Sequence, residues 1–288
     1  MFAFFAVEAL YSYYTHYTGI ELRAVGFNSD SPISPFTSCI CVYMAPCIVM
    51  MLENSLSSIY RKIGLLGVVF CWIALIANDC RTGFLTAAIL IMILGGYQVV
   101  KSPKKLIAVL VVCFVVGSFF CIHPHYKQRI LSISNVTTNA SNLVRLYLWE
   151  DAVEMWQDNN EIAGIGLCSW KKIYVNKYFF DLGCKTKKYL PRPYVQAHSN
   201  YFQLLAETGI IGLGGYLFMM GSFLLYNLLK LRKQYNPFYL ANIGIVLAYN
   251  ICAIFDYILY FPTSTRTFWF MLGAMMVMAQ WYEREKEK

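Results

Sequence analysis

The sequence predicts an all-α protein, a polytopic transmembrane helical bundle with about seven spans, a partial N-terminal helix and one large helical extracytoplasmic loop. Three observations support this prediction. The chain has 288 residues, of which 58% are hydrophobic and only 14% are charged, and its mean hydropathy is +0.48. A soluble domain has about 45–50% apolar and about 25% charged residues. Long apolar segments recur along the chain, and one polar stretch of about 75 residues separates two groups of them.

The apolar segments come close to the length that a bilayer requires, which is about 17–25 residues per helix. The predicted spans are Phe36–Leu52, Ile63–Ala77, Gly83–Val100, Leu106–Ile122, Gly209–Leu229, Tyr239–Phe261 and Thr267–Trp281. Met1–Tyr17 is rich in Phe and Tyr and is interpreted as a partial span or an interfacial helix. Because this start resembles the middle of a helix, we expect the chain to be truncated or to have an earlier start.

The distribution of basic residues predicts which side of the membrane each connection faces. Short connections and the tail on one side hold eleven Lys and Arg residues, whereas the opposite short segments hold three. The eleven are Arg61, Lys62, Lys101, Lys104, Lys105, Lys230, Arg232, Lys233, Arg284, Lys286 and Lys288, and the three are Arg23, Arg81 and Arg266. The positive-inside rule places the eleven in the cytoplasm. The predicted division is 1–35 for the partial helix and external segment, 36–122 for spans one to four, 123–197 for the extracytoplasmic loop, 198–282 for spans five to seven and 283–288 for the cytoplasmic tail.

Four side chains suited to chemistry fall on the predicted external face: His198, Arg145, Arg81 and Arg23. Histidine accepts a proton near neutral pH because its unperturbed pKa is about 6.5. The planar guanidinium of arginine binds phosphate oxygens through two parallel hydrogen bonds and stays charged. Asp256 is expected inside span six, where an acid is a functional candidate by default. We expect it to be the partner of an arginine or of His198.

Five short motifs occur in order around the large loop. They are Arg23-Ala24-Val25-Gly26-Phe27-Asn28, Cys80-Arg81-Thr82-Gly83-Phe84-Leu85, Arg145-Leu146-Tyr147-Leu148-Trp149 with Ala152, Gly164-Ile165-Gly166-Leu167, and His198 to Gly212 with its Glu207-Thr208-Gly209. In order and spacing they resemble the O-antigen ligase and O-antigen polymerase-related membrane proteins of bacterial surface-polysaccharide assembly. The likeness spans roughly residues 20–230. Two departures are that Cys80 stands where the family commonly has serine, and that Asn159-Asn160-Glu161 stands where a proline often precedes Gly-x-Gly.

The resemblance implies a metal-independent membrane glycosyltransferase of the ligase or polymerase type, in lipopolysaccharide or capsule biosynthesis at the bacterial inner (cytoplasmic) membrane. It would transfer an undecaprenyl-diphosphate-linked oligosaccharide to an acceptor glycan or to lipid A-core, with no cofactor. On this interpretation His198 is the catalytic base, and Arg145 and Arg81 stabilise the diphosphate. The residues expected to assist substrate binding are Arg23, Asn200, Trp149 and Asp256, the last as a partner of the catalytic groups.

Other functions remain open at this point. A transporter or flippase for lipid-linked or anionic substrates would also use external arginines, but it predicts inverted repeats, and the sequence shows none. A truncated, inactive paralogue is a third interpretation. No Asp-x-Asp metal motif occurs, and His123-Pro124-His125 is a weak metal candidate without a nearby third ligand. The basic residues alternate with membrane segments, which argues against nucleic acid as a partner. Ligase and polymerase share the motifs.

The candidate residues also have structural interpretations. Arg81 would pair with Asp79, Arg145 would form a helix-surface salt bridge with Glu150, and Arg23 would extend its charge to the membrane interface. Aromatic residues of the loop are candidates for stacking on sugars or for lying on the membrane, namely Tyr174, Tyr178, Phe179, Phe180, Tyr189 and Tyr194. Cys168 and Cys184 share the loop and would be free to pair in an oxidising compartment.

Overall fold

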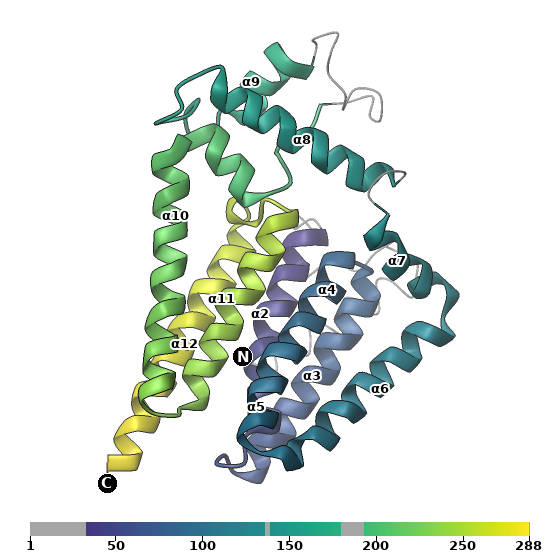
Figure 1. Ribbon diagram of the computed structural model, residues 1–288, viewed down its shortest axis with the longest axis vertical. Helices are drawn as coiled ribbons and strands as arrows, with labels where there is room; N and C mark the ends of the chain where they lie inside the picture. The colour runs from purple at the N-terminus through teal and green to yellow at the C-terminus, as the bar shows by residue number, and fades with distance from the viewer. Residues whose placement is uncertain (1–32, 136–138, 180–192, 288) are drawn as a thin grey trace. The chain divides into compact units, whose positions relative to one another are not determined.

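The computed structural model describes residues 33–135, 139–179 and 193–287, and every regular element in these ranges is a helix. The all-α prediction is therefore confirmed for this part of the chain (Figure 1). The elements are α2 (Ile33–Leu52), α3 (Ser58–Asn78), α4 (Arg81–Leu90), the π-helical η1 (Ile91–Gly95), α5 (Gly96–Lys101), η2 (Pro103–Lys105), α6 (Leu106–Ile122), α7 (Pro124–Ser134), α8 (Ala140–Gln157), α9 (Trp170–Ile173), η3 (Tyr174–Phe179), α10 (Asn200–Lys233), α11 (Pro237–Phe255), η5 (Ile258–Tyr260) and α12 (Pro262–Glu287).

Four helical segments of the described chain are long and apolar enough to cross a membrane. They are Ser58–Asn78, Arg81–Lys101, Asn200–Lys233 and Pro237–Phe255, and Phe36–Leu52 is a shorter apolar helix. These segments make the chain a multi-pass membrane protein. Helices also cover the other two predicted spans, in α6 and α12. The total of seven spans and the sidedness of the loop remain predictions. Met1–Tyr17, Arg23 and Cys184 lie outside the described residues.

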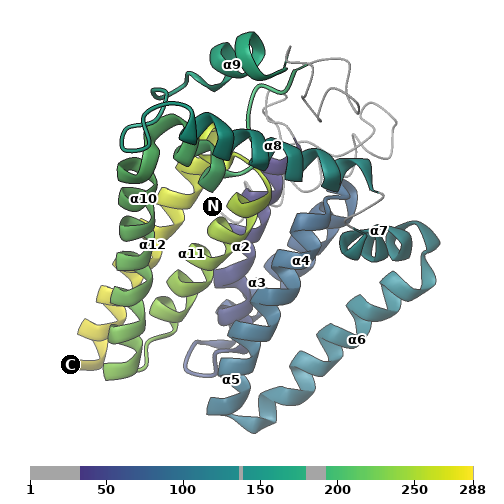
Figure 2. The same ribbon diagram turned by 45° about the horizontal axis from the view of Figure 1, so that its top comes forward.

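Contacts within the chain divide it into two compact units. Of the described residues, the first unit comprises 33–130, 223–252 and 261–287, and its core is built on α2. Ile40, Cys41, Met44 and Ala45 of that helix are completely buried. Helices α3, α4 and α12 of the same unit contact α2. Both ribbon views show α3 and α4 beside α2 (Figures 1 and 2). Because other helices surround α2, apolar residues occur on all of its sides and it has no polar face.

One buried carboxylate joins the connections between helices in the first unit. Glu53, which follows α2, is 4% exposed. Its Oε1 accepts a hydrogen bond from the Ser55 backbone at 2.9 Å, and its Oε2 accepts from Gln98 Nε2 at 3.2 Å and from the Tyr235 hydroxyl. Burial alone raises the pKa of Glu53, but the hydrogen bonds from Tyr235, Ser55 and Gln98 outweigh it and hold the pKa below its usual value. The carboxylate therefore stabilises the folded protein in its charged form.

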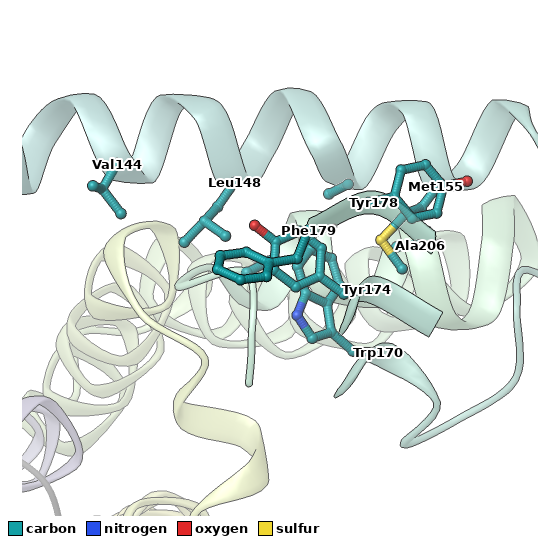
Figure 3. Packing of buried hydrophobic residues seen from close by; sticks show 10 residues of the cluster. Val144, Leu148, Met155, Trp170, Tyr174, Tyr178, Phe179 and Ala206 are labelled. Atoms are coloured by element: carbon teal, nitrogen blue, oxygen red, sulfur yellow. The ribbon is translucent and has the colours of Figure 1, made fainter. Parts of the chain in front are cut away.

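The second unit comprises residues 131–222 and 253–260, and it has its own apolar core. Val144, Leu148, Ala152 and Met155 recur along one side of α8 at helical spacing and are buried. Figure 3 shows Val144, Leu148 and Met155 directed from α8 towards the rings of the neighbouring segments, which are those of Trp170, Tyr174, Tyr178 and Phe179.

This core corrects one expectation for the loop aromatics. Tyr174, Tyr178 and Phe179 are 0%, 7% and 3% exposed, so they are not available to stack on sugars or to lie on the membrane. Tyr174 stacks on Trp170 with ring centroids 5.2 Å apart. The physical reason is that these large rings pack against the apolar side of α8. This packing removes the apolar surface of the rings and of α8 from water, which is favourable. Phe180 and Tyr189 lie outside the described residues.

Candidate functional site

The start of α10 is built around a break at Gly209. Its φ of 62° and ψ of −161° belong to a region that essentially only glycine adopts. The break leaves backbone groups without helical partners, and a short segment of the preceding loop supplies them. Ile210 N donates to Glu161 O at 3.0 Å, and Ile211 N donates to Ile162 O at 3.2 Å.

The carbonyl groups on the other side of the break are paired in the same way. Ala206 O accepts from Ile165 N at 3.0 Å, and Glu207 O accepts from Gly166 N at 2.9 Å. The close approach requires glycine, since a Cβ at Gly164 would lie 2.5 Å from the Glu207 carbonyl carbon. The Gly-x-Gly motif and the Glu-x-Gly motif are therefore two halves of one interlock. It satisfies the backbone groups that a helix break exposes.

Two buried side chains extend this interlock to the segment before α10. Glu207 Oε1 accepts from Trp170 N at 3.0 Å and from Gln203 Nε2 at 3.0 Å. Gln203 Oε1 in turn accepts from Ala197 N at 2.6 Å. Glu207 and Gln203 are each 1% exposed. Together they fix the backbone immediately before His198.

His198 lies two residues before Asn200, the first residue of α10, and has a φ of 51°. This left-handed conformation is uncommon for a residue with a Cβ, although histidine is one of the types enriched there. His198 Nδ1 lies 3.3 Å from Asp256 Oδ1. The imidazole ring packs edge-on against the Tyr194 ring, with the ring centroids 5.2 Å apart. Among the described residues Nε2 has no hydrogen-bond partner. The side chain is 23% exposed, so Nε2 is the nitrogen left to meet a ligand.

The position of Asp256 differs from the prediction. The acid was expected inside a span running from Tyr239 to Phe261, but α11 ends at Phe255 and Asp256 follows it. Its Oδ1 accepts from the Tyr257 backbone N at 2.8 Å and from Gln196 Nε2 at 3.4 Å. A carboxylate that accepts from the next backbone N–H favours a turn over continued helix, which explains the early end. The side chain is nevertheless buried, with 5% of the residue exposed.

Further contacts attach residues 253–260 to the same segment. Asn200 is completely buried, and its Oδ1 accepts from Leu259 N at 3.1 Å. Ser199 Oγ donates to Ala253 O at 3.5 Å. Asn200 Nδ2 is buried and has no partner among the described residues. A buried amide with one unused N–H group is costly unless something binds it.

Arg145 joins this group from α8. Its Nε donates to Phe255 O at 3.1 Å, and its Nη1 donates to Ser141 Oγ at 2.8 Å and to Ser141 O at 3.3 Å. These partners are neutral, and no carboxylate in the described chain forms an ion pair with this guanidinium. The alternative of a salt bridge to Glu150 is therefore wrong. Arg145 thus binds the backbone of Phe255, the residue immediately before the aspartate that contacts His198.

Trp149 lies one turn after Arg145 on α8. Its ring stacks on Phe202 of α10 with centroids 5.0 Å apart and an interplanar angle of 12°. Its Nε1 is buried and has no partner within the described residues. Figures 1 and 2 both show α8 beside the first turns of α10, where this stack forms.

The structure thus brings His198, Asp256, Arg145 and Asn200 together in the second unit. Arg81 is the first residue of α4 and belongs to the first unit. It lies two residues after Asp79, which has a φ of 50°. The Oδ2 atom of Asp79 lies 3.2 Å from His125 Nε2. No group of three or more metal-ligand side chains occurs in the part of the chain that the structure describes.

Sequence reasoning missed the role of Gln196 and the place of Tyr194 against His198. Gln196 lies two residues before His198 in a polar run, and that proximity was the available signal. Tyr194 was recognised only as one of several loop aromatics.

Comparison with known protein families gives a match. A family model described as O-antigen ligase matches residues 66–217, which is more than half of the chain. The matched region contains Arg81, Arg145, His198 and Asn200, whereas Asp256 lies beyond it. No curated protein matches the chain.

Proposed function

The chain belongs to the O-antigen ligase family, and from this premise we propose that it is a metal-independent membrane glycosyltransferase of the ligase or polymerase type. Its donor would be an undecaprenyl-diphosphate-linked oligosaccharide, and its acceptor another glycan or lipid A-core. The observation that carries the proposal is the pairing of His198 with Asp256 at 3.3 Å, next to an arginine that no described carboxylate neutralises.

His198 is the proposed general base. Asp256 accepts from Nδ1, which orients the ring and directs Nε2 to the acceptor hydroxyl. The acceptor oxygen bonds to the anomeric carbon of the donor as its proton moves to Nε2. The bond between that carbon and the phosphate oxygen breaks, and the diphosphate leaves with the electron pair. Asp256 stabilises the imidazolium that forms, and a positioned base of this kind contributes about 10²–10⁴-fold to a rate.

Arg145 is the proposed diphosphate-binding residue. Its Nε and Nη1 are held by Phe255 and Ser141, while Nη2 has no hydrogen-bond partner among the described residues. A fixed guanidinium with free N–H groups can stabilise the negative charge that grows on the leaving diphosphate. We propose the same role for Arg81, and an assisting one for Arg23, from their motifs alone.

Asn200 and Trp149 are proposed to bind substrate oxygens. Each has a buried N–H group, Asn200 Nδ2 and Trp149 Nε1, without a partner among the described residues. Sugar hydroxyl and phosphate oxygens are the natural acceptors for such donors. The proposed location is the bacterial inner membrane, with the loop outside the cytoplasm, because the polyprenyl chain of the donor stays in the bilayer.

The test is complementation of a strain that lacks this gene, with surface polysaccharide analysed on gels and protein levels verified in membranes. His198→Ala and Arg145→Ala are expected to abolish the polysaccharide product, whereas the matched substitutions His123→Ala and Arg232→Ala leave it intact. Full product from His198→Ala and Arg145→Ala at normal protein levels would refute the site. Transport of a lipid-linked substrate without glycan transfer by the unchanged protein would favour the transporter.

A further inference from the structure

Tyr194 occupies a defined position beside the catalytic group. Its ring edge contacts the His198 ring at a centroid distance of 5.2 Å and an interplanar angle of 80°. Its backbone is also fixed, because Trp170 Nε1 donates to Tyr194 O at 3.4 Å. Trp170 is 1% exposed and belongs to the core of the second unit. The phenol is therefore attached to a rigid part of the unit, next to the proposed base.

The hydroxyl group of Tyr194 differs from those of two tyrosines in the core of the same unit. Tyr174 donates its hydroxyl hydrogen to Asp151 Oδ2 at 3.2 Å, and Tyr178 donates to Asp158 Oδ2 at 3.0 Å. In the described chain the Tyr194 hydroxyl has no such partner. A partly buried phenol usually finds an acceptor, so its free hydroxyl indicates that the acceptor comes from outside the protein.

The electrostatic surroundings indicate the charge of that acceptor. Burial raises the pKa of Tyr194, and the positive charge of Arg145 acts in the opposite direction to lower it. The net effect is a raised pKa, so the phenol keeps its proton at neutral pH and is a hydrogen-bond donor. The cation that acts on the phenol is Arg145, whose printed hydrogen-bond partners are all neutral. A cation of this kind favours an anion over a neutral sugar hydroxyl.

We infer that the Tyr194 hydroxyl donates a hydrogen bond to an anionic phosphate oxygen of the lipid diphosphate donor, beside Arg145 and next to His198. The inference rests on the proposed function and adds a substrate-binding residue to it. Tyr194 transfers no proton in this role. The acceptor proton goes to His198, the diphosphate leaves as an anion, and the phenol hydrogen remains on its oxygen throughout.

The test uses the full chain in lipid nanodiscs and compares Tyr194→Phe with Tyr178→Phe. Both substitutions remove one hydroxyl and keep the ring, and Tyr178 lies in the same unit outside the site. The probes are undecaprenyl diphosphate and the uncharged undecaprenol. A hydrogen bond to a charged group is worth about tenfold or more in affinity. Tyr194→Phe is expected to weaken undecaprenyl diphosphate binding by that factor, while Tyr178→Phe leaves it unchanged and both variants bind undecaprenol as the unchanged protein does.

Equal affinity of Tyr194→Phe and the unchanged protein for undecaprenyl diphosphate would overturn the inference. An equal loss of undecaprenol affinity would also overturn it, because the hydroxyl would then act through lipid packing. Steady-state assays separate this failure from failure of the proposed function. If the unchanged protein transfers glycan but Tyr194→Phe raises only the KM for the acceptor, the inference alone fails. If the unchanged protein neither transfers glycan nor binds the diphosphate, both fail.

Discussion

Asp256 holds His198 across 58 residues of sequence, with its Oδ1 3.3 Å from the imidazole Nδ1. The same oxygen accepts from Tyr257 N and Gln196 Nε2, so the carboxylate is fixed before it meets the histidine. Arg145 reaches the neighbouring residue through the Phe255 carbonyl. Two consecutive residues therefore connect the site. Asp256 contacts the proposed base His198, and Phe255 accepts from Arg145, which pairs with no carboxylate in the described chain.

Asp256→Asn tests the orienting role. The amide cannot stabilise the imidazolium and can present its N–H group to Nδ1, which favours the wrong tautomer. We expect the rate of glycan transfer to fall by about 10²–10⁴-fold, the contribution of a positioned general base. Initial rates with purified protein and lipid-linked donor measure this. Asp158→Asn is the matched control, since Asp158 is paired with Lys177 at 3.0 Å away from the site. A rate equal to that of the unchanged protein would count against the role.

Arg145→Lys tests whether the guanidinium geometry matters in addition to its charge. Lysine keeps the charge but cannot both donate to Phe255 O and present a planar pair of N–H groups to phosphate. We expect kcat/KM for the donor to fall by about tenfold or more, which corresponds to one lost charge-assisted hydrogen bond. Arg232→Lys, in the last turn of α10, is the control. Unchanged kcat/KM in Arg145→Lys would show that only a point charge is needed.

Gly209→Ala tests the interlock at the break in α10. An added Cβ would lie 2.4 Å from Ile162 O, and alanine does not adopt the backbone angles found there. We expect a loss of at least about 1–3 kcal/mol of stability, measured as a lower thermal midpoint in detergent. Gly214→Ala, in the same helix with open space around its Cβ position, should be neutral or slightly stabilising. Equal midpoints for both variants would contradict the interlock.

Glu53→Gln tests the buried carboxylate of the first unit. The pKa of Glu53 is lowered in the folded state, so its charge stabilises the protein above the unfolded pKa of about 4.3. That stabilisation is lost as the pH falls through the lower, folded-state pKa. The difference in thermal midpoint between the unchanged protein and Glu53→Gln should be constant from about pH 7 to about pH 5 and should shrink below about pH 4.3. A difference that persists unchanged in acid would contradict the shift.

The sequence predicts the helical class and the chemical candidates because both depend on local patterns. Apolar runs identify spans by length alone, and His198 and Arg145 belong to motifs with recognisable neighbours. The early end of α11 at Phe255 was missed because hydropathy continues through Tyr257 to Phe261, whereas the turn depends on the Asp256 carboxylate.

Other features depend on contacts that no local pattern reports. The burial of Tyr174 follows from its packing against α8, about twenty residues earlier in the chain. The free hydroxyl of Tyr194 is recognised only by comparison with the partners of Tyr174 and Tyr178. Arg81 and Arg23 were proposed on the same kind of motif as Arg145, and their roles remain predictions.

The most direct test of the central claim is a double-mutant cycle on His198 and Asp256, with glycan transfer measured for His198→Ala, Asp256→Ala and the double variant. If Asp256 acts through His198, removal of the acid from a chain that already lacks the base costs little, so the double variant should be as slow as His198→Ala alone. If the two losses multiply, the residues act independently, and the account of a single catalytic pair is contradicted.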